Sequence, residues 1–360
     1  MLAAYVSGHG FGHATRTGEV LRQLRELAPK LPISVCTSAP AALFSDAVAP
    51  PLSFREIEAD VGLVQKDALT IDEAASAEAA ARFRSGWPAL VEREARWLRD
   101  AGVSLVLGDI PPLAFAAAAE AGLPSIALGN FSWDWIYRHL GRRHPLLLEA
   151  AEHAARAYST AGLLLRLPFA GDLSVFPRIE DIPLVARRPA VPKAEARRRL
   201  SLDGRPAVLL SFGGIGMPDL DPASLGRLES YQFLLTGRVG NGDAPNLRRV
   251  GADDLAAARM QYPELVGAVD VVVSKPGYGI VTDCIGAGAR FVYTDRGDFP
   301  EYEIFVAEMP RFLPVRFVSN DDLRASRLEE ALRDVRAIAF PPPPPADGAG
   351  VAALRLLATL

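Results

Sequence analysis

Cysteine is scarce in this sequence of 360 residues, since only Cys36 and Cys284 occur and they lie far apart. Two distant cysteines provide neither a disulfide framework nor the paired spacing of a zinc site, so we expect a reducing compartment and no bound metal. Long apolar runs are also missing, and no basic segment precedes the apolar residues 2–6 as it would in a signal peptide. We therefore expect a cytoplasmic protein without a membrane span.

An excess of charge of one sign is absent as well. The chain has 39 Lys and Arg against 43 Asp and Glu, a formal net charge of -4, which argues against a nucleic-acid partner. The hydrophobic fraction of 49% is ordinary for a globular protein. Because 360 residues exceed what one hydrophobic core usually supports, we expect two domains.

Short apolar runs alternate with amphipathic stretches twice along the chain. The predicted strands of the first half are 2–6, 33–37, 105–107, 125–128 and 162–166. Those of the second half are 207–212, 232–236, 269–274 and 290–294. Runs of this kind with helical segments between them are typical of βαβ units and parallel sheets.

This alternation predicts an α/β protein with two Rossmann-like domains, residues 1–168 and 205–340. A connector at 169–204 is indicated by its spaced prolines and weak apolar periodicity. Five consecutive prolines, 341–345, predict an extended spacer. The apolar end of the chain then predicts a short packed helix within 347–360.

Residues 8–16 combine three glycines and two histidines between the first strand and the first helix. The dinucleotide fingerprint would need glycine in place of His13 and an acidic residue after the second strand, so we expect neither NAD nor another cofactor. A histidine at the carboxyl end of a parallel strand is a candidate general base, which makes His13 the catalytic candidate. The alternative is that His13 caps the helix or bonds backbone. His9 is expected to support the structure or position the substrate.

Asp109 follows another predicted strand and comes directly before Ile110-Pro111-Pro112. Its carboxylate is expected at the same sheet edge as His13, where it could orient the imidazole. The alternative is that Asp109 caps the alanine-rich helix that follows.

Two glycine-rich loops in the second half are of the kind that offers backbone N–H groups and a helix N-terminus to phosphates. The first is Ser211 to Gly216, which includes Phe212, Gly213 and Gly214. The second is Ser274-Lys275-Pro276-Gly277-Tyr278-Gly279, and Asp283 follows it by about one turn. A diphosphate is expected at the second loop, with Asp283 accepting hydrogen bonds from ribose hydroxyls.

Four segments together resemble the GT-B nucleotide-sugar enzymes, and more closely the glycosyltransferase-like domain that precedes the kinase domain of plant arabinokinases. They are Gly8 to Arg16, Asp109 to Pro112, Asn130 to Tyr137 and Lys275 to Gly279. The resemblance implies two domains facing each other across a cleft, with the acceptor on the first domain and the nucleotide sugar on the second. It also implies that the terminal helix crosses back to the first domain.

The residue patterns and the resemblance together give the candidate site residues. The catalytic residues are expected to be His13 and Asp109. Nucleotide-sugar contacts are expected from Gly10, Gly12, Phe212, Gly213, Gly214, Ser274, Lys275, Pro276, Gly277, Tyr278, Gly279 and Asp283. Acceptor contacts are expected from His9, Arg16, Asn130, Trp133 and Asp134. The aromatic residues 131–137 would either stack on an acceptor sugar or pack in the core.

The sequence departs from these relatives in several ways. Asp283 stands where many nucleotide-sugar transferases carry glutamate, and the paired glutamates of many retaining enzymes are missing. The glycine-serine phosphate loop of the kinase is also missing, so we expect no kinase domain. The expected activity is metal-independent, inverting transfer from a nucleotide sugar, UDP-linked, to an unidentified small-molecule acceptor. Residues 10–13 also resemble the loop of a UDP-sugar hydrolase, so hydrolysis is an alternative. A third possibility is a nucleotide-sugar-binding module without turnover.

Overall fold

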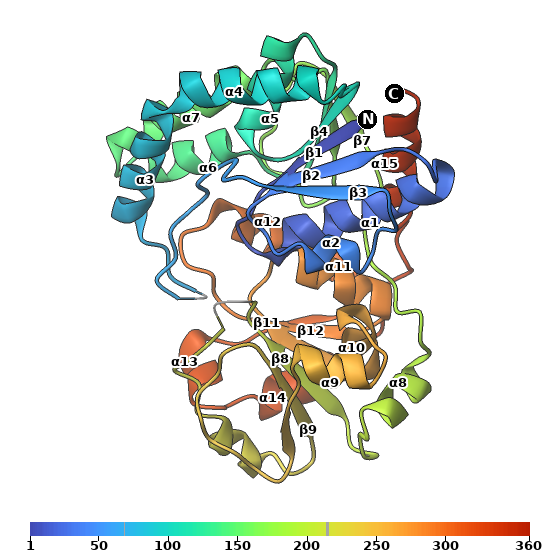
Figure 1. The fold of residues 1–360 in the computed structure, drawn as a ribbon. Coiled ribbons are helices and arrows are strands. Elements are labelled where there is room, and N and C mark those ends of the chain that lie inside the picture. Colours follow the sequence, from blue (N-terminus) through green and yellow to red (C-terminus); the bar gives the residue numbers. More distant parts are fainter. Residues whose placement is uncertain (68, 214–215) are drawn as a thin grey trace.

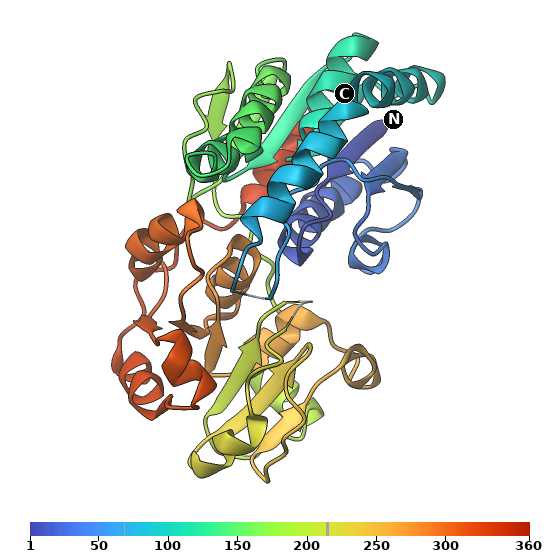
Figure 2. The ribbon, with the colours of Figure 1, turned by 90° about the vertical axis from the view of Figure 1, so that its left-hand side faces the viewer.

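The computed structural model describes residues 1–67, 69–213 and 216–360, and its two halves lie one above the other (Figure 1). Among these residues, one sheet has seven strands and the other six, and every neighbouring pair is parallel. Helices surround both sheets, as the view from the side shows (Figure 2). The predicted α/β architecture of two Rossmann-like domains is confirmed.

The first sheet has the strand order β3-β2-β1-β4-β5-β6-β7. Its strands are β1 (Leu2–Val6), β2 (Ile33–Thr37), β3 (Leu52–Glu56), β4 (Leu105–Asp109), β5 (Ser125–Gly129), β6 (Leu163–Arg166) and β7 (Ile179–Asp181). The central strands are continuous apolar runs because both of their faces are covered. The strand order reverses between β1 and β4, the place where open α/β sheets bind ligands.

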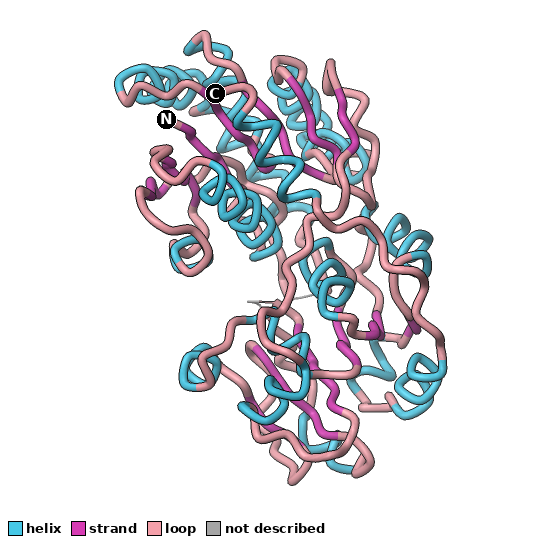
Figure 3. Tube along the Cα trace, turned by 90° about the vertical axis from the view of Figure 1, so that its right-hand side faces the viewer, coloured by secondary structure: helices cyan, strands magenta, loops and turns pink. Residues whose placement is uncertain are grey.

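Alternate residues of β1 pack on opposite faces of the sheet. Leu2 and Ala4 face α1 (Phe11–Leu27) and α15 (Gly348–Leu357), whereas Ala3 and Tyr5 face the helices of the other layer. The remaining helices of this domain are α2 (Ala42–Ser45), α3 (Glu73–Ser85), α4 (Trp87–Asp100), α5 (Pro112–Ala121), α6 (Trp133–Leu140) and α7 (Pro145–Tyr158). Since α15 packs beside α1, both ends of the chain lie on the first domain (Figure 3).

The second sheet has the order β10-β9-β8-β11-β12-β13. Its strands are β8 (Ala207–Ser211), β9 (Gln232–Thr236), β10 (Leu247–Arg249), β11 (Val271–Ser274), β12 (Arg290–Tyr293) and β13 (Val315–Phe317). The accompanying helices are α8 (Lys193–Arg199), α9 (Ala252–Ala257), α10 (Tyr262–Ala268), α11 (Tyr278–Ala287), α12 (Pro300–Glu308), α13 (Asn320–Arg324) and α14 (Glu329–Ala337), with the 3₁₀ turns η1 (Pro222–Arg227) and η2 (Met309–Arg311).

A single cluster of buried apolar side chains extends from the α1 side of the first domain into the second domain. Phe169 is a link in it, because its ring centroid lies 4.8 Å from that of Phe305 and 4.9 Å from that of Phe312. Burial of apolar surface therefore holds the two domains together in addition to the polar contacts described below.

Two expectations about boundaries need correction. The first sheet extends beyond residue 168, since β7 lies within the predicted connector 169–204 and pairs with β6. This edge strand reads Ile-Glu-Asp and carries no apolar alternation that could reveal it. The first helix begins at Phe11, so Gly12 and His13 belong to its first turn rather than to the loop before it.

Candidate active site

The edge of the first sheet between β1 and β4 brings two sequence-distant segments together. Val6 at the end of β1 lies opposite Asp109 at the end of β4. After β1 the chain turns at Gly10, whose φ of 82° lies in the left-handed region that glycine adopts without strain. It enters α1 one residue later, which places His13 next to Asp109.

The His13 imidazole binds the Asp109 carboxylate, with 2.8 Å between Nδ1 and Oδ1. The His13 side chain is 9% exposed, and the ring of Phe131 packs edge-on against it with 5.5 Å between centroids. His13 Nε2 has no hydrogen-bond partner in the described part of the chain. It is also not one of the buried side-chain nitrogen or oxygen atoms that lack a partner there, so it is not shut off from solvent. The helix α5 has Pro111 at its N-cap and no side-chain cap, so Asp109 does not take the alternative capping role.

The Asp109 carboxylate is fully buried and accepts hydrogen bonds from three side chains. Besides His13, Arg16 donates from Nε at 2.8 Å and from Nη2 at 2.5 Å, and the Thr17 hydroxyl donates at 2.6 Å. Burial raises the pKa of Asp109, but the positive charge of Arg16 and the hydrogen bonds outweigh it and hold the pKa at about 2. An ionised carboxylate can only accept, so His13 donates from Nδ1 and keeps the lone pair on Nε2.

Arg16 is buried between the two domains rather than presented to an acceptor. Its guanidinium binds Asp109, donates from Nη1 to Asn130 Oδ1 at 2.7 Å, and lies 5.2 Å from the ring centroid of Tyr278. Arg16 Nη2 is also 3.1 Å from His13 Nδ1, but both atoms are donors, so this is a packing contact. Asn130 is fully buried as well, so neither residue is placed to touch an acceptor.

A second histidine–carboxylate pair lies beside the first. His9 Nε2 is 3.6 Å from Asp60 Oδ1, and its side chain is 35% exposed. Asp60 also accepts from the Ser7 hydroxyl at 3.1 Å and from Trp133 Nε1 at 2.8 Å. His9 is therefore the more accessible of the two histidines at this sheet edge.

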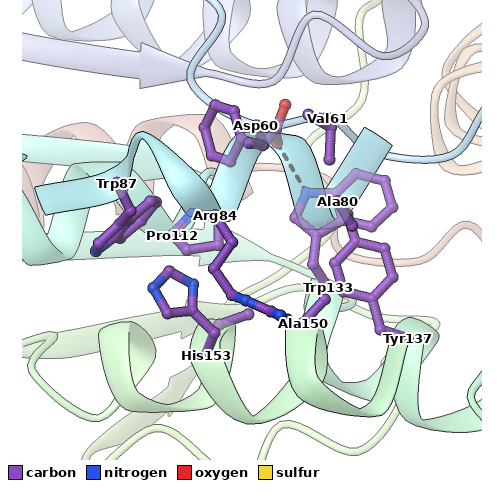
Figure 4. Close-up of a pocket in the computed structure, with 12 residues that line it drawn as sticks. Asp60, Val61, Ala80, Arg84, Trp87, Pro112, Trp133, Tyr137, Ala150 and His153 are labelled. Carbon is purple, nitrogen blue, oxygen red and sulfur yellow. Dashed lines mark hydrogen bonds between the residues drawn. The ribbon is translucent and has the colours of Figure 1, made fainter. Parts of the chain in front are cut away.

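The aromatic segment after β5 packs in the core, which decides between the two interpretations of residues 131–137. Trp133 is 4% exposed and stacks on Tyr137 with 5.6 Å between centroids. Behind Trp133, a cavity of about 30 Å³ lies between α3, α6 and α7, large enough for about one water molecule (Figure 4). Asp134 is also buried, with Oδ2 3.3 Å from Arg138, so Trp133 and Asp134 do not form the predicted acceptor surface.

The first turns of α1 and α11 meet where the domains face each other. A Cβ atom added to Gly279 would lie 3.1 Å from the Cα atom of Gly12, so only glycine fits this approach without displacing backbone. The helix α11 begins at Tyr278 with Gly277 as its N-cap, and no side chain caps it. Two helix N-termini that no side chain caps thus converge, and the positive ends of their dipoles favour an anion.

Lys275 and Arg296 add positive charge beside this point. Burial lowers the pKa of Lys275 to about 7, and the nearby charge of Arg296 acts in the same direction. Arg296 donates to the Pro276 carbonyl at 3.2 Å, and burial lowers its pKa. Ser274 is buried, and its hydroxyl donates to the Ser211 carbonyl, so it connects the starts of the two glycine-rich loops.

Other predicted nucleotide-binding residues have structural partners. The Asp283 carboxylate is 3% exposed and is bound by Arg187 Nε at 3.0 Å, so it is not presented to a ribose. The Tyr278 hydroxyl accepts from the Val185 N–H at 3.0 Å and thereby holds the interdomain connector. Phe212 is buried, Gly213 is exposed, and Gly214 lies outside the described residues.

Neither a metal site nor a membrane span is found in the described residues. Within residues 1–67, 69–213 and 216–360, no group of three or more His, Cys, Asp or Glu is arranged to hold a metal ion. In the same ranges, no helix combines the length and the apolar character that crossing a bilayer requires.

Sequence reasoning missed Glu301 and Arg296. Glu301 is 3% exposed and accepts from Asn130 Nδ2 at 2.6 Å, which joins the second domain to the Arg16 cluster. Glu301 stands in the first turn of α12, where an acidic residue has an ordinary electrostatic reason to occur. No sequence signal distinguished it from other such residues.

Sequence comparison identifies one informative relative. No protein-family model matches the chain. An L-arabinokinase of Arabidopsis thaliana is 33% identical over 325 residues, which are 87% of this chain and 30% of the relative. The chain thus spans about a third of the length of that protein.

Several solved structures of similar shape are glycosyltransferases. The kitacinnamycin glycosyltransferase matches with a TM-score of 0.61 and 16% identity over 99% of this chain and 95% of its own. CalG4, the calicheamicin glycosyltransferase, gives 0.60 and 14% over 99% and 94%. A transferase from Siraitia grosvenorii in complex with UDP gives 0.58 and 15% over 100% and 94%.

Proposed function

We propose that this chain, which has the GT-B fold of glycosyltransferases, transfers a sugar from a UDP-type nucleotide sugar to a small-molecule acceptor. The observation that carries the proposal is the buried pair of His13 and Asp109, with 2.8 Å between Nδ1 and Oδ1, at the face turned toward the second domain. An imidazole held by an ionised carboxylate at Nδ1 has its basic nitrogen, Nε2, available for a proton.

In the proposed reaction, His13 Nε2 removes the proton of an acceptor hydroxyl as its oxygen attacks the anomeric carbon. The bond from that carbon to the diphosphate oxygen breaks, and both bonding electrons leave with the nucleoside diphosphate. A single displacement of this kind inverts the anomeric configuration. Asp109 stabilises the imidazolium that forms and fixes its orientation.

The negative charge that develops on the leaving diphosphate is assigned to the positive groups of the second domain. The N-terminus of α11 and the side chain of Lys275 lie at the loop that follows β11. The N-terminus of α1 approaches them at Gly12. Preorganised positive charge in a water-poor site stabilises such a transition state strongly, so we propose that no metal ion is required.

Diphosphate binding is expected to depend on the protonation of Lys275. Since the pKa of this partly buried ammonium is about 7, much of it is neutral above that pH in the free protein. A bound diphosphate favours the charged form, so binding raises the pKa and takes up a proton. The affinity for UDP should be greatest below about pH 7 and fall as the pH rises through the pKa of the complex.

Calorimetric titration with UDP in two buffers of different ionisation enthalpy measures this proton uptake at about pH 8. The variant Lys275→Met is the comparison, because it keeps the length of the side chain and removes the titrating group. Uptake should disappear in the variant. Equal affinity of the unchanged protein at about pH 6.5 and 8.5 would contradict the role given to Lys275.

Hydrolysis of the nucleotide sugar is the second candidate, and the small exposed fraction of His13 favours it. A side chain that is 9% exposed admits water more readily than a bulky acceptor. The same histidine would then take a proton from water, and free sugar would be released without any acceptor. Transfer predicts slow or no release of UDP until an acceptor is added.

Thermal unfolding with a panel of nucleoside diphosphates and their sugars tests the proposed site, with a chelator present. A ligand at about a hundred times its dissociation constant adds roughly 2.7 kcal/mol to the free energy of unfolding. We expect a selective rise of the unfolding temperature with UDP and one or more UDP-sugars. No shift with any nucleotide would contradict the proposal, and tight binding without turnover would indicate a binding module.

A further inference from the structure

A continuous series of buried polar side chains connects the His13–Asp109 pair to the second domain. It runs from Asp109 through Arg16 and Asn130 to Glu301, the residue that belongs to the other domain. Asp109 and Asn130 are fully buried, and Arg16 and Glu301 are each 3% exposed. Buried charges of this kind are stabilised only by their hydrogen-bond partners, so each member depends on the next.

The amide of Asn130 matches the two charged groups that it joins. A guanidinium can only donate, so Oδ1 must face Arg16, whose Nη1 is 2.7 Å away. A carboxylate can only accept, so Nδ2 must face Glu301, whose Oε1 is 2.6 Å away. Glu301 thereby determines which way the amide points, and the amide determines whether an acceptor faces Arg16.

Glu301 is itself tied to the phosphate-type loop. Its Oε2 lies 3.2 Å from Arg296 Nη1, and the same nitrogen donates to the Pro276 carbonyl at 3.2 Å. The Arg296 guanidinium packs over the Phe299 ring at 3.9 Å, which limits its movement. The series therefore ends at the backbone of the loop to which we assign the diphosphate.

We infer that Glu301 is a positioning residue that completes the His13–Asp109 pair only when the two domains are closed; this inference rests on the proposed function. If the domains separate, Asn130 loses its carboxylate partner and keeps the weaker bond to the Phe169 carbonyl at 3.3 Å. Arg16 then loses a fixed acceptor, and its hold on Asp109 loosens. Misplacement of a catalytic group by about 1 Å can cost on the order of a hundredfold in rate.

Another interdomain contact provides a matched control. Asp298 lies three residues before Glu301 and binds His139 Nε2 at 2.6 Å and Arg143 Nη2 at 2.5 Å, both on the first domain. These groups are partly or largely exposed, and no hydrogen bond described for this structure connects them to Asp109. We expect Asp298→Asn to weaken the contact between the domains at this edge and to leave the buried series intact.

The experiment compares Glu301→Ala with Asp298→Asn in steady-state kinetics with the UDP-sugar that stabilises the protein. For Glu301→Ala we expect kcat to fall by about tenfold to a hundredfold and KM for the donor to change by less than about threefold, because Glu301 acts on the pair rather than on the ligand. Asp298→Asn should keep kcat within about twofold.

A double variant tests whether the two residues act as one unit. In Asn130→Ala/Glu301→Ala, kcat should fall no further than in the worse single variant. Additive losses, or equal losses in both interdomain variants, would overturn the inference.

A second readout does not require turnover. The Nδ1 proton of His13, hydrogen-bonded to Asp109, is expected to give a far-downfield resonance, which is assigned by its absence in His13→Asn. We expect this resonance to shift or broaden in Glu301→Ala and to be unchanged in Asp298→Asn. If the unchanged protein neither transfers nor hydrolyses any sugar, the proposed function fails while the resonance still tests the coupling.

Should Glu301→Ala fail to fold, Glu301→Gln keeps the volume of the side chain. Its amide can accept from Asn130 or from Arg296 but must donate toward the other, so one end of the series still breaks. A resonance and a kcat identical to those of the unchanged protein in this variant would also overturn the inference.

Discussion

Replacement of His13 by alanine is expected to lower kcat by about a hundredfold to ten-thousandfold and to leave the affinity for UDP within a few-fold. General-base catalysis contributes roughly two to four powers of ten in rate. His13 Nδ1 lies 2.8 Å from the fully buried Asp109 carboxylate, whereas His9 Nε2 lies 3.6 Å from that of Asp60 and its side chain is more exposed. UDP affinity should persist because the diphosphate is assigned to the α11 loop, whereas His13 acts on the acceptor hydroxyl.

The matched control is His153→Ala. His153 is a half-buried histidine of the same domain that packs edge-on against Trp87, with 4.4 Å between centroids, on α7. It should change stability but not kcat. Steady-state release of UDP from the stabilising UDP-sugar measures both variants, and wild-type kcat in His13→Ala would remove His13 from the chemistry.

Asp109→Asn is expected to lower kcat by a similar or larger factor and also to destabilise the fold. An amide turned toward His13 can present a donor, which favours the wrong tautomer of the imidazole, and this change alone costs about ten-thousandfold in a well-studied triad. It also leaves the buried Arg16 without its counter-charge, and removal of one partner of a buried ion pair costs about 3–5 kcal/mol.

Kinetics on the folded fraction and denaturant unfolding separate these two effects. Asp270→Asn serves as the comparison, since Asp270 binds Lys193 and Arg197 in the second domain and should lower stability alone. The pKa of Asp109 is lowered from 3.8 to about 2, so the stability from its ionisation is complete above about pH 4 and is lost as the pH falls through about 2. Normal kcat in Asp109→Asn would contradict its assignment as the partner of His13.

The central strands of both domains could be predicted closely from sequence because they are buried on both faces. The bounds 2–6, 33–37 and 232–236 agree with β1, β2 and β9. The strands that escaped prediction lie toward the edges of the sheets, namely β3, β7, β10 and β13, whose residues are mostly intermediate or exposed. A strand of three to five residues with one covered face has too few apolar positions for a period of two to be recognised.

The pairing of His13 with Asp109 could be anticipated because topology alone brings the two residues together. His13 comes shortly after β1 and Asp109 ends β4, and these adjacent parallel strands leave their C-terminal residues within side-chain reach at one sheet edge. The role of Arg16 was harder to predict, since a guanidinium one turn into a helix is equally typical of a ligand contact. Arg16 is buried partly because the second domain approaches it, and no pattern within residues 1–168 predicts that approach.

The remaining site residues could not be placed from sequence because their partners are distant in the chain. Asp283 is paired with Arg187 of the connector, a partner 96 positions away that no local pattern suggests. Asn130 and Glu301 are 171 positions apart and meet only because the two domains are in contact at that point. Trp133 was expected at an acceptor surface because of its type, but its indole N–H satisfies the buried Asp60.

The configuration of the first product tests the central claim most directly. Proton NMR follows the wild-type protein with the stabilising UDP-sugar, a chelator and a set of hydroxylated acceptors from the first minutes, before free sugar can equilibrate its anomers. We predict release of UDP together with a glycoside or free sugar of inverted anomeric configuration. Retained configuration, or no release of UDP from any nucleotide sugar that binds, would contradict a single displacement assisted by His13.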